Sequence, residues 1–286
     1  KILTAVLEMA RRKQQRNRDR RDGEKHAEIQ RVRLGTRLPV YLPQRVTPEL
    51  VAILAEFKAQ AAAVGIRQFV IQTHFEAPLE VTPEARDAID RLLAAGWTVT
   101  NQHVFTTASS RRGHTARLRE VLGEVGVLPY YTFSVKGYME NSFNFATNAR
   151  AMQEQIEEKA AGAIGPQHHH RLADLPAEPS RIPERLRALR EELEVPFLAT
   201  DRNVLKLPGM GKSLTYRVIG ITRYGRRILE FDHDGTRRHS PIIARMGRIV
   251  IIESKSISEY LAQLAQIGED PGDYASLWGY SLGETE

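Results

Sequence analysis

Apolar and polar residues follow one another in a repeating order along the first half of this chain. Residues 66–78 show the order most clearly, because the apolar run 69–71 passes into a polar tip and then into a Thr-Pro-Glu sequence at 82–84. A buried strand followed by a capped amphipathic helix is one βα unit. The functional groups of such a unit lie at the carboxyl end of its strand, so we expect them near residues 72–74.

The same unit recurs at a spacing of about 35 residues, a period that suits βα repeats and helical solenoids alike. The β-branched and aromatic runs between the helices favour the βα interpretation. Strands are expected at 32–41, within 66–78 up to the polar tip at 72–74, at 97–105 and at 127–133, with helices at 50–60, after 82–84, near 114–123 and at 148–159. Thr47 and Thr82 are the expected N-caps of two of these helices. The order predicts an α/β fold, a partial (βα) TIM-like barrel with parallel strands.

After the βα repeats, the sequence pattern changes first to a proline-rich segment and then to short alternating runs. Short alternating runs with glycine turns near the end predict a mainly antiparallel β appendage with a helix. Before them, a segment rich in proline predicts a linker with one short helix at 184–192, and 195–201 predicts a further barrel strand that ends in Asp201. The expected parts are an N-terminal helix and charged loop (1–27), the barrel (28–160), the linker (161–194) and the last strand with the β-rich region (195–286).

Composition fits a globular protein of one or two domains. The chain has 286 residues, 42% of them hydrophobic, which is enough to bury a sizeable core. Lys and Arg number 41 against 35 Asp and Glu, and much of the net charge of +6 comes from 11–21. In the charged stretch 16–26 acidic residues are mixed in and no aromatic residue is present, so it predicts a solvated helix end and loop rather than a nucleic-acid site.

Features that the sequence lacks narrow the class of protein. A membrane span needs about 18 apolar residues in a row, and neither such a run nor a signal-peptide pattern occurs, so we expect a cytoplasmic protein with no membrane partner. The chain contains no cysteine, which excludes disulfides and cysteine-bound clusters within these residues. Three histidines at 168–170 lack acidic partners at ligand spacing and predict a surface loop rather than a metal site. A homo-oligomer is left open.

Two groups of residues are candidates for chemistry. His74, Gln102 and the tyrosines at 130–131 stand at the ends of successive expected strands, and a parallel sheet would bring them to one rim. The glycine-rich turn at 209–213 carries Lys212, which is compatible with a phosphate loop, a Schiff-base lysine or an ordinary turn. The phosphate-loop pattern needs a glycine where the chain has Lys206, which disfavours the first of these.

The segment 36–51, Thr-Arg-Leu-Pro-Val-Tyr-Leu-Pro-Gln-Arg-Val-Thr-Pro-Glu-Leu-Val, resembles the lysine 2,3-aminomutase family of radical S-adenosylmethionine enzymes. Further matches follow in the family's order at 73–75, 101–102, 129–131 and 209–212. The resemblance implies a partial barrel that holds a [4Fe-4S] cluster, S-adenosylmethionine and pyridoxal phosphate. It also implies migration of an amino group between adjacent carbons of an amino acid, started by a 5′-deoxyadenosyl radical.

Carried over position by position, the resemblance assigns roles to five residues. His74 and Gln102 match positions near S-adenosylmethionine, and Lys212 matches the catalytic lysine that binds pyridoxal phosphate. Lys136 stands where lysine-acting members have an aspartate, so the resemblance implies a substrate with an acidic side chain. The second substrate contact aligns with Asp201 or Asn203.

The sequence departs from the family pattern in three places. The cysteine loop that holds the cluster is missing from these residues, the glycine-rich turn is one glycine shorter, and Phe133 replaces a tyrosine. Two interpretations follow. Either the chain is a portion of a radical aminomutase-like enzyme whose cluster ligands lie elsewhere, or it is a non-catalytic relative that serves as a binding module.

Overall fold

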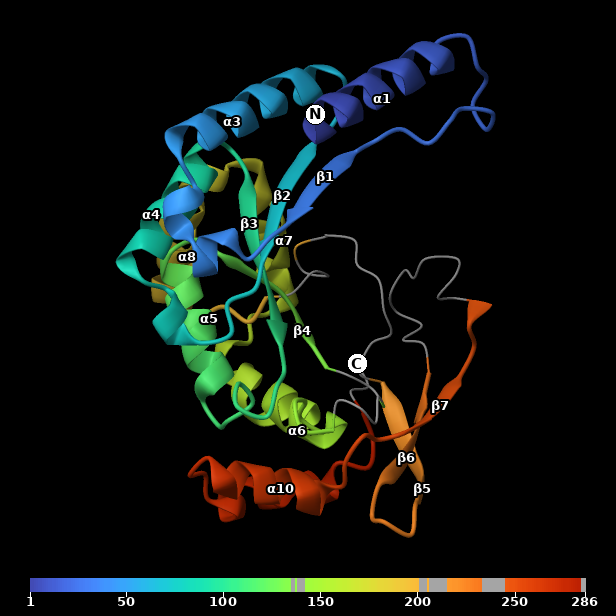
Figure 1. Ribbon diagram of the computed structural model, residues 1–286, viewed down its shortest axis with the longest axis vertical. Helices are drawn as coiled ribbons and strands as arrows, with labels where there is room; N and C mark the ends of the chain where they lie inside the picture. Colours follow the sequence, from blue (N-terminus) through green and yellow to red (C-terminus); the bar gives the residue numbers. More distant parts are fainter. Residues whose placement is uncertain (135–136, 138–141, 201–204, 206–214, 233–244, 284–286) are drawn as a thin grey trace.

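The computed structural model describes residues 1–134, 137, 142–200, 205, 215–232 and 245–283. Its four strands β1–β4 form a parallel sheet in chain order, and three further strands form a separate antiparallel sheet in the order β5–β6–β7 (Figure 1). The strands are β1 (Arg31–Gly35), β2 (Gln68–Thr73), β3 (Thr98–Val104), β4 (Leu128–Phe133), β5 (Tyr216–Ile221), β6 (Arg227–Phe231) and β7 (Ile249–Ile252). This confirms the predicted fold class, a partial βα barrel with an antiparallel β appendage.

Helices connect the parallel strands and cover one face of their sheet. Figure 1 shows α3, α4, α5 and α8 on the same side of β1–β4. The helices are α1 (Ile2–Asn17), α2 (Leu38–Tyr41), α3 (Pro48–Ala63), α4 (Pro83–Ala94), α5 (His114–Glu124), α6 (Asn148–Gln153), α7 (His169–Ala173), α8 (Ile182–Leu193) and α10 (Ile257–Gln266). Over the described ranges, none of them has the length and apolar character needed to cross a membrane.

The two expected N-caps are confirmed. Thr47 accepts a hydrogen bond from the backbone nitrogen of Leu50 at 3.3 Å, and Thr82 accepts one from Ala85 at 3.2 Å. Proline follows each threonine at the first helical position, where its missing N–H costs no hydrogen bond. The caps fix where α3 and α4 begin, and with them the lengths of the loops that follow β1 and β2.

The main core lies between the parallel sheet and these helices. Every second strand residue points toward the helices, so Ile71 and Val99 are buried against them. Trp97, fully buried, stacks on Phe57 at 6.1 Å between ring centroids, and its indole N–H donates to the Leu54 carbonyl at 3.0 Å. A buried indole with a satisfied N–H therefore joins α3 to the start of β3.

Two expected strands differ from the structure. The first ends at Gly35 instead of continuing to residue 41, because the Thr36 hydroxyl accepts from the Leu38 nitrogen at 3.0 Å and opens the short helix α2. The strand expected at 195–201 is wrong over its described residues: 195–200 have irregular backbone. There, Ala199 donates to the Gly162 carbonyl at 2.7 Å rather than to a neighbouring strand.

The segment 161–194 contains more helix than the sequence indicates. The expected helix at 184–192 lies within α8, and α7 precedes it. Leu172, Leu186 and Leu189 of these helices belong to the same buried cluster as the parallel sheet. The four-part division of the chain stays a prediction, but this segment packs into the barrel core.

The appendage is joined to the barrel by a buried carboxylate. Glu253, just after β7, pairs with Arg227 of β6 at 2.6 Å and accepts from the backbone nitrogen of Asn148 at 3.0 Å. Asn148 is the first residue of α6, so the charge also meets the positive end of that helix. One side chain thus connects the antiparallel sheet to the barrel helices.

Candidate functional site

The carboxyl ends of β2 and β3 bring His74 and Gln102 to neighbouring positions at one rim of the sheet. The two strands are parallel and paired, with Thr73 opposite Asn101. Side chains alternate between the two faces of a strand, so Asn101 and His103 turn toward the helices while Gln102 turns to the opposite face. The rim therefore has two layers with different chemistry.

On the face opposite the helices, polar side chains form a hydrogen-bonded row across all four parallel strands. The Arg33 Nη1 donates to Gln72 Oε1 at 2.9 Å, and Gln72 Nε2 donates to Gln102 Oε1. The Tyr131 hydroxyl donates to the same Gln102 oxygen at 2.9 Å. We call these four residues the polar row. Gln72 is only 6% exposed, so its amide depends on these partners.

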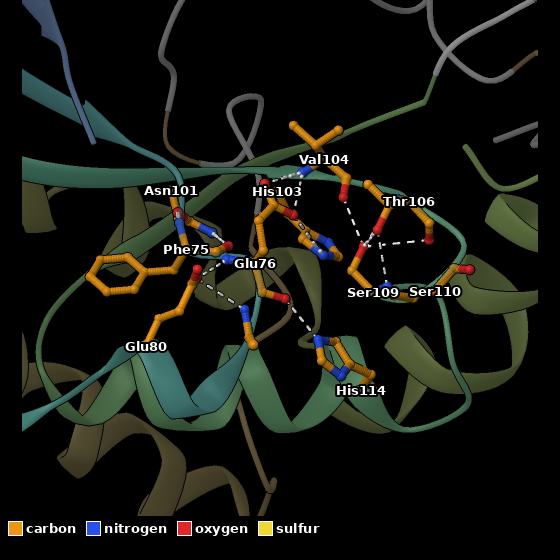
Figure 2. A network of polar contacts seen from close by, with 12 residues as sticks. Phe75, Glu76, Glu80, Asn101, His103, Val104, Thr106, Ser109, Ser110 and His114 are labelled. Carbon is orange, nitrogen blue, oxygen red and sulfur yellow. Dashed lines mark hydrogen bonds and ion pairs between the residues drawn. The ribbon is translucent and has the colours of Figure 1, made fainter. Parts of the chain in front are cut away.

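On the helix-covered face, Asn101 holds the loop that follows β2. Its side chain accepts from the Phe75 nitrogen at 2.7 Å and donates to the Phe75 oxygen at 3.0 Å, as a paired strand would (Figure 2). Phe75 is fully buried and Asn101 is 3% exposed. Because Phe75 follows His74 directly, this pair of hydrogen bonds fixes the backbone that carries the imidazole.

Glu76 and Glu80 secure the rest of that loop (Figure 2). The Glu76 carboxylate accepts from the Val104 nitrogen at 3.2 Å, and its backbone oxygen meets His114 Nε2 at 2.7 Å. Glu80 accepts from the backbone nitrogens of Glu76 at 2.5 Å and Ala77 at 3.2 Å. The loop is thereby tied to β3 and α5.

Glu76 also lies beside His103, whose ring is almost fully buried. The Glu76 Oε2 is 3.6 Å from His103 Nε2, and among the described residues neither ring nitrogen of His103 has a hydrogen-bond partner. Burial raises the pKa of Glu76 to about 7. Burial, reinforced by the Arg119 charge, lowers the pKa of His103 to about 3. At neutral pH the imidazole is therefore uncharged, and the contact is not an ion pair.

The His74 side chain is half-buried at the rim. Burial, with the nearby Arg37 charge as a second cause, lowers the pKa of His74 below its usual value. Arg37 is held in place by Glu80 at 3.3 Å and lies over the Tyr41 ring at 4.1 Å. Both causes favour the uncharged form of the imidazole.

The structure brings together only part of the candidate set. His74, Gln102 and Tyr131 lie at the rim, whereas Tyr130 is buried in the core on the helix side. Lys136, Asp201, Asn203 and Lys212 lie outside the described residues. Their roles stay predictions.

The sequence analysis gave no role to Arg33, Asn101 or Glu76, and it included Gln72 only as part of the polar strand end at 72–74. A usable signal was present for Arg33, a polar residue at an alternate position of an expected strand. No local pattern gives the roles of Asn101 and Glu76, because their partners lie far away along the chain.

The three consecutive histidines lie in short helices rather than in a loop. His168 ends a 3₁₀ turn, and His169 and His170 open α7. Within the part of the chain that the structure describes, no group of three or more acidic, histidine or cysteine side chains is arranged to hold a metal ion.

A parallel βα sheet with polar side chains at the carboxyl ends of its strands is the architecture of the (βα)-barrel class of proteins. Relatives define the particular family. An uncharacterized KamA family protein of Methanocaldococcus jannaschii is 31% identical over 254 residues, which cover 87% of this chain and 34% of the relative. An L-lysine 2,3-aminomutase of Methanococcus maripaludis is 29% identical over 160 residues (56% of this chain, 34% of the relative). The chain belongs to the lysine 2,3-aminomutase family.

A glutamate 2,3-aminomutase of Clostridioides difficile is also similar, with 33% identity over 118 residues, 41% of this chain and 26% of the relative. The chain spans about a third of the length of the first two relatives. No protein-family model matches it.

Proposed function

We propose that this chain is part of a radical S-adenosylmethionine, pyridoxal-phosphate-dependent aminomutase-like enzyme, and that its rim binds S-adenosylmethionine. The observation that supports this most directly is the rim itself, where His74 and Gln102 lie at the ends of adjacent strands in a member of the aminomutase family. The substrate we propose is an amino acid whose amino group moves between adjacent carbons.

The rim residues suit S-adenosylmethionine. Within the described part of the chain, the Gln102 amide nitrogen has no acceptor, because both hydrogen bonds of that side chain use its oxygen. It can therefore donate to an oxygen or ring nitrogen of the nucleoside. The lowered pKa of His74 favours its uncharged form, which does not repel the positive sulfonium. When bound, S-adenosylmethionine would supply the radical that starts the rearrangement.

The [4Fe-4S] cluster does not fit these residues alone. The family's cluster is held by cysteine thiolates, and this chain has none. Cluster ligands would have to come from polypeptide outside these residues. What the described residues do is bind and orient: the Asn101 and Glu80 contacts hold the His74 loop, and the polar row holds Gln102.

The test of the S-adenosylmethionine site is binding to the chain itself. We expect saturable binding by titration calorimetry, weakened at least about tenfold in His74→Ala, a loss of roughly 1.4 kcal/mol. His26→Ala, in the exposed loop after α1, is the matched control and should bind as the wild type does. No saturable binding, or equal loss in both variants, would contradict the proposal.

Pyridoxal phosphate is proposed to bind at Lys212, and a substrate with an acidic side chain at Lys136, on the family resemblance. Adding the cofactor should produce a new absorption band that Lys212→Ala abolishes and Lys206→Ala retains. Equal spectra for the two variants would refute the Lys212 assignment. The similarity to both lysine and glutamate aminomutases leaves the side-chain preference a proposal.

A further inference from the structure

The polar row has a hydrogen-bond direction, and one of its members fixes it. A guanidinium has only donors, so the Gln72 side chain must turn its oxygen toward Arg33. The Gln72 nitrogen is then left to face Gln102, whose oxygen must accept. With respect to the described residues, Gln102 consequently keeps its N–H₂ group for a ligand.

Among the contacts within the row, that of Arg33 is the one that fixes this direction. A glutamine side chain presents an oxygen and a nitrogen of nearly equal size, so rotation by half a turn exchanges donor and acceptor. The Tyr131 hydroxyl can donate or accept. Without Arg33, the contacts within the row no longer fix its direction, and in the reversed direction Gln102 would present its oxygen instead.

The setting of the row makes a wrong orientation costly. Gln72 is nearly fully buried, and a buried amide facing a like group loses its hydrogen bond without gaining one from water. The orientation of the buried Gln72 amide therefore determines which atom of Gln102 faces it. Arg33 itself is exposed on the edge strand β1.

We propose that Arg33 is a positioning residue that acts through Gln72 to make Gln102 a hydrogen-bond donor, so that the ligand group met by Gln102 is an acceptor. Suitable acceptors are a purine ring nitrogen, a ribose oxygen or a carboxylate oxygen. The ligand part of this inference rests on the proposed S-adenosylmethionine site, whereas the direction of the row does not.

The direction is tested without a ligand, by solvent exchange of the glutamine side-chain amides in protein labelled with ¹⁵N-glutamine. In the wild type and in Arg33→Lys, which also only donates, a Gln72 amide proton should be protected. In Arg33→Met we expect that protection to fall at least about tenfold, or to pass to Gln102. Arg31→Met is the control, because Arg31 lies on the same strand and face but donates to Gln68, outside the row.

Unchanged protection in Arg33→Met, or an equal loss in Arg31→Met, would overturn the direction. Failure of Arg33→Lys to show the wild-type pattern would overturn it as well. Lysine retains a hydrogen-bond donor, so such a failure would mean that Arg33 acts through packing rather than through donation.

The nature of the ligand group is tested by Gln102→Glu, which keeps an oxygen for Gln72 and Tyr131 but replaces the free donor with an acceptor. We expect S-adenosylmethionine to bind at least about tenfold more weakly to this variant at pH 8. Equal or tighter binding would overturn the inference. If the wild type fails to bind S-adenosylmethionine, the proposed site and the ligand part fail together, while the exchange experiment still decides the direction of the row.

Discussion

Asn101 and Gln102 are neighbours in sequence but lie on opposite faces of β3. Asn101 takes the place of a backbone partner for Phe75, while Gln102 joins the polar row. The strand's alternation of faces causes this division, because successive side chains point in opposite directions. One dipeptide therefore both holds the His74 loop and presents a donor to the rim.

Glu76 and His103 respond to pH in opposite senses. The pKa of Glu76 rises from 4.5 to about 7 on folding, so its contribution to stability is full below pH 4.5 and is lost as pH rises through 7. The pKa of His103 falls from 6.5 to about 3, so its contribution is full above pH 6.5 and is lost as pH falls toward 3. Between pH 4.5 and 6.5 the two effects oppose each other.

Glu76→Gln should remove the pH dependence that Glu76 gives to stability and leave that of His103. Glutamine retains an oxygen for the Val104 nitrogen but carries no charge. The difference in unfolding free energy between variant and wild type should shift in favour of the variant by roughly 2 kcal/mol from pH 5 to 6.5. Chemical denaturation across this range measures it.

Glu8→Gln, the same carboxylate-to-amide change on the exposed surface of α1, is the control for this measurement, and an equal shift in that variant would mean that the effect does not come from the Glu76 site. A constant difference for Glu76→Gln would show that the Glu76 carboxyl titrates normally.

At the scale of elements, signals that act within a few residues predicted the structure well. The threonine caps with their following prolines located the starts of α3 and α4, and the glycine-bounded alternating runs located β5 to β7. The strand expected at 195–201 failed where it is described, because an apolar run is a strand only if a neighbour offers its backbone. Here the backbone of Ala199 bonds to the Gly162 turn instead.

At the scale of the whole molecule, the C-terminal region is bound to the barrel through two buried tyrosines. The Tyr260 hydroxyl of α10 lies 2.6 Å from the Ser110 hydroxyl in the loop after β3. The Tyr274 hydroxyl accepts from the Arg112 nitrogen at 2.9 Å and donates to Glu269 at 2.5 Å. Both rings pack with Phe105 in one buried cluster, so the helices after the appendage return to cover the barrel loop.

Truncating Tyr274 should therefore destabilise the whole chain. We expect Tyr274→Ala to lower the free energy of unfolding by about 3–5 kcal/mol, as for other large buried aromatics. Tyr274→Phe keeps the ring and removes only the hydrogen bonds, so a loss of about 1 kcal/mol is expected. Denaturant titration measures both.

Trp278, 61% exposed on the same 3₁₀ segment (Pro271–Gly279), provides the control. Its replacement by alanine should change the free energy of unfolding by no more than about 0.5 kcal/mol. Equal losses for Trp278→Ala and Tyr274→Ala would mean that the segment is not docked through Tyr274.

The sequence by itself determined the repeating βα order, the helix caps, the antiparallel appendage and the family, because each depends on residues close together along the chain. His74 and Gln102 could be proposed in the same way, since strand ends can be read from hydrophobic pattern. Only the tertiary structure decided that Asn101 holds Phe75, that Glu76 meets His103, and that Arg33 acts on Gln102 through Gln72. These contacts join residues of different strands or of the loop after β2, and their geometry exists only once the parallel sheet has set the register between the strands.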